Sequence, residues 1–558
     1  MIKAVFPLFL ALSMIPLAAE DFKVSDVIHP VVAELNDPAV DPNFGKGMLA
    51  ISSSSEEASL QVTQGMARLT SSWDFEAYRH FCAAAKKDPD CMMAFWGIAM
   101  SLAGGEHEFY TQREVAVDRM LDLLEAGQGV EIERGYVEAA GRLLTGGVRE
   151  AGKTFEAISK KFPADIFSKL FSLFLLRDGY DSFGDPRPGQ RNAMEGLREL
   201  LKQYPDNYSV LSFWVGSQSE SSMLPAELRK EVLPFAGKLV EMKPNYPPFH
   251  LKLAHVEARC GNASRAIASC RKAIELFEQY LDNEKVSLFD CEGLIRSKVY
   301  LAHLLAVKGE LAEGMKVAAE LAKIKISEER VFSKGAVMLL WEARTIGARL
   351  SLGGSTKEEF EAGLKNLDTL PKEQWFQKQS LVGDYRDALA LCLGIRKALL
   401  AKDRKAVVQL YEQFLQRAKS FETQRKLAAK TSSYSAWLRA LNTMNLLAGE
   451  LRGALSELEE GAMKQAAVSW YGSAADLQGR PENLLPPSLD YPIEMWLGRF
   501  YLSEEKADEA AKAFRKGLYV RPNHLGTLEG YRDALLKQGR EEDAAVLDRR
   551  IEAVKNGG

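Results

Sequence analysis

Apolar residues recur at helical spacing over most of the chain, and the pattern is fullest in one unit near the C-terminus. There Leu497 and Tyr501, four positions apart, share a face of one predicted helix beside Gly498, while Ala510 and Phe514 share a face of the next. Small residues at Gly498 and Ala510 let two antiparallel helices approach closely, and the larger side chains fill the space around that contact. Pro522 ends the second helix because its ring cannot continue a helical backbone. The pattern therefore predicts a compact pair of helices.

The same spacing of small, large and helix-breaking residues recurs along the chain. It is repeated by Ala77, Phe81 and Pro89, by Ala151, Phe155 and Pro163, and, with Leu for Phe, by Ala193, Leu197 and Pro205. This is the spacing of the roughly 34-residue tetratricopeptide helix–turn–helix repeat. Each pair has an apolar face that only a neighbouring pair can cover, so such units stack into a curved superhelix with a concave groove. The sequence predicts an all-α fold, an α-solenoid of tetratricopeptide-type repeats.

The first residues have the pattern of an export signal. Lys3 is followed by an apolar run that ends in Ala18 and Ala19, directly before Glu20. A basic start, a short apolar stretch and small residues before a charge indicate a secretory signal peptide over residues 1–19. An N-terminal membrane anchor is the alternative, although the run is shorter than the roughly 20 residues that span a bilayer.

The remaining chain is expected to fall into four parts. Residues 20–60 are predicted to be an irregular N-terminal segment, and residues 61–310 a first array of tetratricopeptide repeats. Residues 311–435 have helical periodicity but match the repeat poorly, so they are interpreted as divergent helical repeats, with a separate helical domain as the alternative. Residues 436–558 are predicted to form a C-terminal array with capping helices.

Charge and cysteine usage narrow the functional classes. The chain of 558 residues has a formal net charge of −4 and no basic block with interleaved aromatic residues, which argues against nucleic-acid binding. Beyond the N-terminus there is no long uninterrupted apolar run, so we expect no integral membrane segment in the mature chain. The six cysteines are interpreted as buried thiols, or as including one disulfide between Cys260 and Cys270.

Three stretches resemble a family of large exported bacterial tetratricopeptide-repeat proteins. The stretches are 64–99, Tyr246–Ala266 and 486–530, which carry Asp88-Pro89-Asp90, Pro247-Pro248 and Pro522-Asn523. The family tends to place two His around a Pro in the middle stretch, where this chain has only His250. The resemblance implies the repeat fold and export, and it implies no biochemical activity.

Motifs of common enzyme classes are missing from the sequence. There is no G-x-S-x-G, no H-E-x-x-H, no C-x-x-C, no phosphate-binding glycine loop and no dinucleotide fingerprint. We therefore expect no catalytic residues, no cofactor and no metal. If the chain is instead an enzyme or metal-binding protein, its site must be assembled from distant helices, with Glu106, His107 and His255 as nominees.

The candidate partner-binding site is the concave groove. First-helix positions that face the groove in tetratricopeptide families map onto three helices of this chain. They are Met93, Trp96 and Met100, then Leu251, His255 and Arg259, and finally Met495, Arg499 and Leu502. Met and Trp suit an adaptable apolar contact, and arginine pairs with carboxylates.

These observations predict an exported interaction scaffold, periplasmic or secreted, that binds a protein or peptide partner and is not catalytic. A structural protein that self-associates through its end repeats is one alternative. An enzyme or metal-binding protein is the other.

Overall fold

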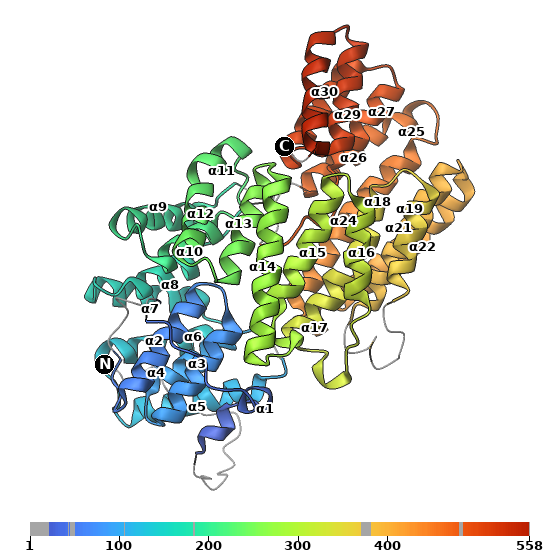
Figure 1. Ribbon diagram of the computed structural model, residues 1–558. Helices are drawn as coiled ribbons and strands as arrows, with labels where there is room; N and C mark the ends of the chain where they lie inside the picture. Colours follow the sequence, from blue (N-terminus) through green and yellow to red (C-terminus); the bar gives the residue numbers. More distant parts are fainter. Residues whose placement is uncertain are drawn as a thin grey trace.

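The chain forms an all-helical solenoid, as the repeat spacing predicts. The computed structural model describes residues 22–42, 44, 51–104, 107–181, 185–369, 376, 381–478 and 484–556. In this part, strand-like pairing is limited to one isolated bridge between Tyr180 and Pro186. Consecutive helices pack on one another in pairs, and the pairs stack from the N-terminus to the C-terminus (Figure 1).

The helices up to the middle of the chain pair in sequence order. Two short elements come first: η1 (Val24–Val27) and α1 (Pro30–Ala33). The pairs that follow are α2 (Glu56–Thr70) with α3 (Asp74–Lys87), α4 (Met92–Ser101) with α5 (Tyr110–Glu125), α6 (Glu131–Leu144) with α7 (Val148–Lys161), α8 (Ile166–Leu176) with α9 (Pro188–Gln203), α10 (Tyr208–Ser217) with α11 (Pro225–Glu231) and α12 (Leu233–Met242), and α13 (Pro247–Arg259) with α14 (Ala263–Glu284).

The second half continues the same arrangement with more irregular turns. It contains η2 (Leu288–Asp290), α15 (Glu292–Val307), α16 (Leu311–Ala322), η3 (Glu328–Arg330), α17 (Lys334–Met338), a π-helical turn (Leu339–Ala343), α18 (Arg344–Leu352), α19 (Lys357–Leu367), α21 (Gly383–Leu400), α22 (Arg404–Thr423), α23 (Arg425–Ala428), α24 (Tyr434–Ser456), α25 (Gly461–Gln465), α26 (Ala467–Gln478), α27 (Ile493–Ser503), α28 (Ala507–Val520), α29 (Leu525–Lys537) and α30 (Glu541–Asn556).

The contact that holds a helix pair together is the same at both ends of the chain. A Cβ added to Gly498 would lie 2.7 Å from the Phe514 ring, and one added to Gly530 would lie 2.4 Å from it. Gly65 and Gly97 stand in the same relation to Phe81, at 2.8 and 2.1 Å. Each ring is thus pressed between a glycine of its own repeat and one of the next, which explains why small residues are required there.

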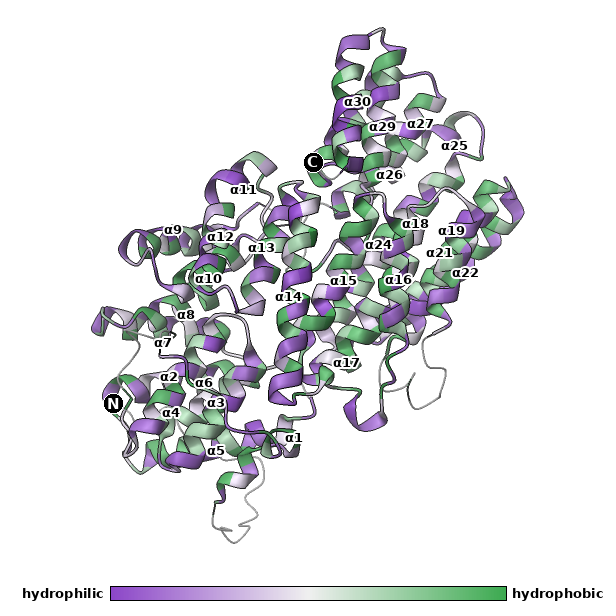
Figure 2. Ribbon diagram, in the orientation of Figure 1, coloured by the Kyte–Doolittle hydropathy of each residue, from purple (hydrophilic) through white to green (hydrophobic). Residues whose placement is uncertain are grey.

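Two large hydrophobic clusters and several smaller ones form the core. One large cluster runs from Val27 to Cys260 and the other from Val331 to Ala534. The second cluster crosses the predicted boundary between residues 435 and 436. In Figure 2, hydrophobic and hydrophilic residues alternate along most helices, as expected where each helix buries one face.

The N-terminal segment packs on the repeats. Phe44 is 2% exposed and its ring lies 4.9 Å from that of Tyr208. The hydroxyl of Tyr78 accepts a hydrogen bond from the His29 amide and donates one to the Val27 carbonyl, both at 2.9 Å. Helix α2 already begins at Glu56, so the segment predicted to be irregular through residue 60 ends earlier than expected.

The superhelix brings distant repeats into contact. Asn523 donates a hydrogen bond to the Gly261 carbonyl at 2.7 Å. On another side, Arg330 binds Glu108 at 2.9 Å and Lys334 binds Asp74 at 2.7 Å. These contacts tie the C-terminal repeats, and separately the N-terminal repeats, to the middle of the chain.

Two further expectations concern membranes and cysteines. No helix in the described ranges has both the length and the apolar character needed to cross a bilayer. All six cysteines are free and buried, so Cys260 and Cys270 act as small packed side chains rather than as a disulfide. The predicted signal peptide at residues 1–19 lies outside the described residues.

Candidate functional site

A pocket of about 290 Å³ lies between repeats that are far apart in the sequence. One wall is formed by α13, α15 and the segment before α11. The opposite wall is formed by the stretch between α26 and α29. Two turns position the C-terminal wall. Gly261, with φ +81°, lies so close to Pro522 and Asn523 that a Cβ there would be 3.0 Å from the Asn523 amide nitrogen. Leu525 approaches the next turn at Gly309 equally closely.

Arg259, at the end of α13, is the central cation of one wall. Its guanidinium donates to the main-chain carbonyls of Gln218 at 2.5 Å, Ser219 at 3.2 Å and Ser221 at 2.6 Å. Burial lowers the pKa of Arg259 to about 10, so it remains charged at neutral pH. These three partners are neutral, and hence they fix the guanidinium without cancelling its charge.

Three histidines line the pocket, and each is held neutral. Burial first, and nearby arginines second, lower the pKa values of His255, His303 and His524 to about 3. His255 bonds the Tyr300 hydroxyl at 3.0 Å and the Ser219 carbonyl at 3.2 Å.

The other two imidazoles differ in how they are held. His524 Nδ1 accepts the Thr527 amide at 3.2 Å and thereby caps α29. His303 is 5% exposed, and its Nδ1 has no hydrogen-bond partner.

Acidic groups occupy the C-terminal wall and the rim. Burial raises the pKa of Asp490 to about 7, while Arg521 and Arg349 oppose the shift. Glu494 is 2% exposed, with one carboxylate oxygen 3.5 Å from the Lys516 ammonium and the other without a hydrogen-bond partner. Lys516 also lies 3.9 Å from Asp476.

A buried ion cluster fixes the loop that forms part of the pocket. The π-helical turn presents Glu342, which binds Arg349 at 2.7 Å and Arg439 at 2.8 Å. Arg439 also donates to the Pro486 carbonyl at 2.7 Å. Two guanidinium groups thus bind one carboxylate. A π-helical turn is often found at functional positions.

Only two of the predicted groove residues line this pocket, namely His255 and Arg259. Met93 and Trp96 are 0% exposed, and Leu251 and Met495 are 5% and 1% exposed. These four side chains therefore pack in the core instead of lining an open groove. Trp96, for example, is covered by the rings of neighbouring helices, including Tyr136 of α6 at 5.3 Å and Phe171 of α8 at 5.9 Å.

The other predicted groove residues lie elsewhere. Met100 and Leu502 are partly buried against the two large clusters. The Arg499 guanidinium lies 4.8 Å from the Trp496 ring centre, and that of Arg396 lies 4.2 Å from it. Arg499 is therefore held against an aromatic ring that a second cation also contacts.

The nominated metal or enzyme residues do not form a cluster. His107 bonds the Leu102 carbonyl at 2.9 Å and accepts the Phe109 amide at 3.1 Å, which makes it a local loop support. Glu106 lies outside the described residues. Among the residues that the structure describes, no group of three or more His, Cys, Asp or Glu side chains is arranged to hold a metal ion.

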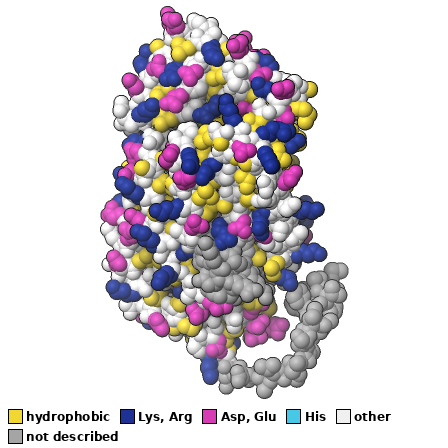
Figure 3. Space-filling model, turned by 90° about the vertical axis from the view of Figure 1, so that its right-hand side faces the viewer, with side chains coloured by type: hydrophobic (Ala, Val, Ile, Leu, Met, Phe, Trp, Pro, Cys, Tyr) yellow, Lys and Arg dark blue, Asp and Glu magenta, His cyan; other side chains and the backbone are white. Residues whose placement is uncertain are grey.

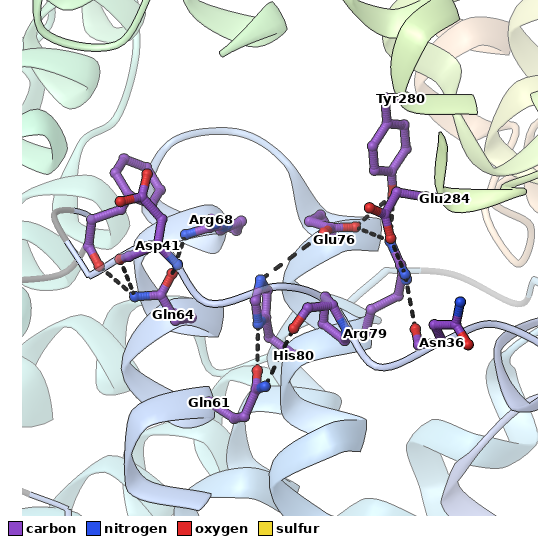
Figure 4. A network of polar contacts seen from close by, with 12 residues as sticks. Asn36, Asp41, Gln61, Gln64, Arg68, Glu76, Arg79, His80, Tyr280 and Glu284 are labelled. Carbon is purple, nitrogen blue, oxygen red and sulfur yellow. Dashed lines mark hydrogen bonds and ion pairs between the residues drawn. The ribbon is translucent and has the colours of Figure 1, made fainter. Parts of the chain in front are cut away.

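A second polar cluster, which the sequence did not reveal, joins α3 to α14 (Figure 4). Glu76 accepts from Arg79 at 2.8 Å and from the Tyr280 hydroxyl at 2.5 Å, and Arg79 also binds Glu284 at 2.8 Å. His80 bonds Gln61 at 2.6 Å. These side chains bond mainly to one another across the two helices, although Arg79 Nε and His80 Nε2 have no hydrogen-bond partner, so we interpret this cluster as a clamp between repeats. Its only sequence signal is a set of charged residues on the buried face of a helix.

An open groove of about 660 Å³ lies on the outer surface between α21 and α22. Asp387 and Arg417 line it together with Leu391 and Leu410. Figure 3 shows the side of the molecule on which α22 lies, where hydrophobic side chains form a central band among mixed charges. The groove is shallow and lined by one pair of helices, whereas the inner pocket is built from distant repeats.

The C-terminal pair completes the assignment of the repeats. Residues 495–524 match the family model described as tetratricopeptide repeat. This part of the chain is a tetratricopeptide repeat. The match covers part of α27, α28 and the turn that carries Asn523, so the repeat contributes one wall of the pocket.

Several solved structures align with most of this chain at low identity. The Cut9–Hcn1 hetero-tetramer of APC/C shares 15% identity at a TM-score of 0.33, covering 86% of this chain and 76% of that one. The human IFIT1 dimer with m7Gppp-AAAA shares 12% at 0.32, covering 84% and 95%, and yeast Tom70 shares 12% at 0.24, covering 89% and 99%. No curated protein matches the sequence.

Proposed function

We propose that this protein is an exported, non-catalytic scaffold that captures a segment of a protein partner in the inner pocket. Tetratricopeptide solenoids present extended inner surfaces to other proteins. The observation that carries the proposal is the pocket itself, which two distant parts of the solenoid build together. Its mixture of arginine, imidazole, carboxylate and apolar groups suits a partner segment with both polar and apolar side chains.

The test fills the pocket without removing a hydrogen bond. Ala263 lines the pocket at the start of α14, and Ala263→Trp adds a large side chain there. The matched control is Ala545→Trp, at an exposed position of α30. Cross-linking in the native cell envelope, followed by purification and mass spectrometry, identifies partners of each variant. A partner lost only with Ala263→Trp supports the proposal, whereas a partner retained by both variants places binding elsewhere.

Export is tested separately. If residues 1–19 are removed as a signal peptide, the mature protein begins at Glu20. Mass spectrometry of the N-terminal peptide from the secreting host measures this directly, and an uncleaved Met1 peptide would contradict export by this route.

Self-association is the second candidate, because large hydrophobic side chains are exposed near the C-terminal end. On α29 and α30, Leu536 is 49% and Val546 is 53% exposed. Light scattering over a wide concentration range measures the mass. A dimer of the wild type that becomes monomeric in Leu536→Glu and Val546→Glu would favour this function. A single monomeric mass of the wild type would exclude it.

A further inference from the structure

We propose that an N-terminal segment of this chain is an internal ligand, which covers a binding surface for an extended, acidic segment of a partner protein. The segment, called the strap below, consists of residues 36–42 and Phe44. It lies on α2, α3 and the adjacent ends of α10 and α12. None of these contacts involves the inner pocket, so the inference goes beyond the proposed function.

The first observation is that side chains of the repeats bind the main chain of the strap. Gln61 of α2 donates to the Pro38 carbonyl at 3.3 Å. Gln64, one turn further along α2, accepts from the Asp41 amide at 3.2 Å and donates to the Asp41 carbonyl at 3.0 Å. Hydrogen bonds to main-chain atoms hold an extended chain without depending on most of its side chains, as in peptide recognition.

Both glutamines are oriented by neighbours within the repeats. Arg68 donates to Gln64 Oε1 at 2.8 Å, and His80 bonds Gln61 Oε1 at 2.6 Å. With both amide oxygens engaged in this way, the amide nitrogens are directed towards the strap. The surface under the strap is therefore arranged by the repeats themselves and is ready to accept another chain.

The start of the strap is bound in the same manner by α3. Arg79 donates to the Asn36 carbonyl at 3.0 Å, and its guanidinium also binds Glu76. Figure 4 shows Asn36 on one side of this polar network and Asp41 on the other. A segment that only filled a gap in the core would meet apolar side chains. The strap instead meets a row of polar ones.

The strap also has one side in solvent. Its two inward side chains are Pro38 and Phe44, which are buried, whereas several others are exposed, namely Asn36, Asp37, Ala39 and Pro42. Residues 36–41 belong to neither helix nor strand. The strap thus lies on the repeats as a docked peptide does, and its release leaves the helix pairs intact.

The second observation is that both acids of the strap pair with lysines of the repeats. Asp37 binds Lys86 of α3 at 2.8 Å, and Asp41 binds Lys243 at the end of α12. The side chains of the two acids are 39% and 38% exposed. Ion pairs that water reaches contribute little to stability and are weakened by salt. They select an acidic segment and still permit one such segment to replace another.

The third observation is the seat of Phe44. Its ring lies 4.9 Å from that of Tyr208 and 5.2 Å from that of Tyr246. The Arg68 guanidinium lies 4.5 Å from the ring centre and the Lys243 ammonium 5.5 Å from it. Aromatic and cationic groups around one ring make a specific seat for an aromatic side chain. The partner segment therefore carries an acid and, three positions later, an aromatic residue.

The experiment measures binding of two labelled peptides to the full chain by fluorescence anisotropy. One peptide has the sequence of residues 36–44, and the other has lysine in place of the acid that corresponds to Asp41. Two variants loosen the strap by placing like charges together: Asp41→Lys and Lys243→Glu. The control is Glu138→Lys, a charge reversal in the exposed pair of α6. Circular dichroism confirms that the variants fold.

We expect Asp41→Lys to bind the acidic peptide about tenfold more tightly than the wild type and the control do, because its own strap no longer competes. Lys243→Glu is expected to prefer the lysine peptide, also by about tenfold. A misfolded variant cannot produce this reversal of preference. The inference is overturned if neither peptide binds either variant, if both variants prefer the same peptide, or if the control behaves as Asp41→Lys does.

Hydrogen exchange of the wild type, followed by mass spectrometry, needs no variant. The Asp41 amide is held only by the strap's own docking, so it is expected to exchange much faster than amides within α2 and α3. If the Asp41 amide exchanges as slowly as they do, the strap leaves only when the repeats unfold, and the inference fails.

Light scattering identifies a different occupant of the surface. A wild-type dimer that becomes monomeric in Asp41→Lys would show that a second copy's strap binds there, which overturns the assignment to a partner protein. The scaffold proposal fails on another result, namely a partner that Ala263→Trp retains. That result concerns the inner pocket and leaves the peptide measurements unaffected.

Discussion

Replacing Arg330 by methionine is expected to destabilise the protein much more at pH 8 than at pH 5. Arg330 binds Glu108 at 2.9 Å and Asp290 at 2.6 Å, and the side chains of the two acids are only 11% and 3% exposed. Glu108 precedes α5 whereas Asp290 and Arg330 lie in η2 and η3, so this one guanidinium connects segments that are 222 positions apart. Without it, two buried carboxyl groups lose their shared cation.

The pKa values set the pH window. Burial raises the pKa of Glu108 from 4.5 to about 7 and that of Asp290 from 3.8 to about 6, while Arg330 opposes both shifts. Because the folded pKa values are raised, the folded state binds more protons, and the stability that this provides is present below about pH 4 and is lost as the pH rises to about 7. For Glu108 the loss is about 3 kcal/mol in the wild type.

The variant adds a further loss that depends on ionisation. At pH 8 the variant must either bury charged carboxylates without a cation or protonate them against the pH of the solution, which costs about 3–5 kcal/mol. At pH 5 both groups are mostly protonated, so the additional loss is much smaller. His29, the other titratable group influenced by Arg330, has its pKa lowered to about 4 by burial and by that arginine, and thus stays neutral between pH 5 and pH 8.

Urea unfolding at pH 5 and pH 8, followed by circular dichroism, measures the difference. Arg142→Met is the control, because Arg142 pairs with Glu138 at side-chain exposures of 45% and 55%, where such pairs contribute about 0–1 kcal/mol. If Arg330→Met lowers stability equally at both pH values, the reasoning about buried ionisation is refuted.

The remaining predictions concern the core. Gly97→Ala places a Cβ 2.1 Å from the buried Phe81 ring and is expected to lower the free energy of unfolding in urea by about 1–3 kcal/mol. Gly141→Ala is the control, because no atom lies within 4 Å of its added Cβ, and it is expected to stabilise α6 slightly. Equal effects of the two variants would contradict the packing argument. Phe514→Ala is expected to cost about 3–5 kcal/mol by the same assay, and a cost below 1 kcal/mol would contradict full burial of the ring. Burial lowers the pKa of Lys252 from 10.5 to about 7, so the free energy of unfolding increases as the pH rises from 7 towards 10.5. Lys252→Met should therefore raise the urea midpoint of unfolding more at pH 6 than at pH 9. The opposite order would show that the lysine is hydrated. A thiol reagent should label no cysteine of the native protein and all six after denaturation, because all six are buried, and rapid native labelling would contradict that burial.

The local pattern of the sequence determined the repeat itself. Phe81, Phe155 and Phe514 were predicted to fill the core, and all three are 0% exposed. The reason is that small and large residues within one helix pair meet across a few ångströms, and their spacing along the chain fixes this contact. The domain boundaries, the absence of catalysis and the export signal remain predictions, because helix packing does not depend on them.

Only the tertiary structure decided which residues form the site. The sequence singled out His255 and Arg259, but it gave no reason to join them to His303, Asp490 or His524. Their meeting depends on the contact between Gly261 and Asn523, which lie 262 positions apart. Small rotations between successive repeats accumulate over that distance and decide whether the superhelix closes on itself, and no single repeat encodes their sum. Trp96 is covered more locally, by Tyr136 of α6 and Phe171 of α8, which belong to the following repeats and which its own repeat does not contain.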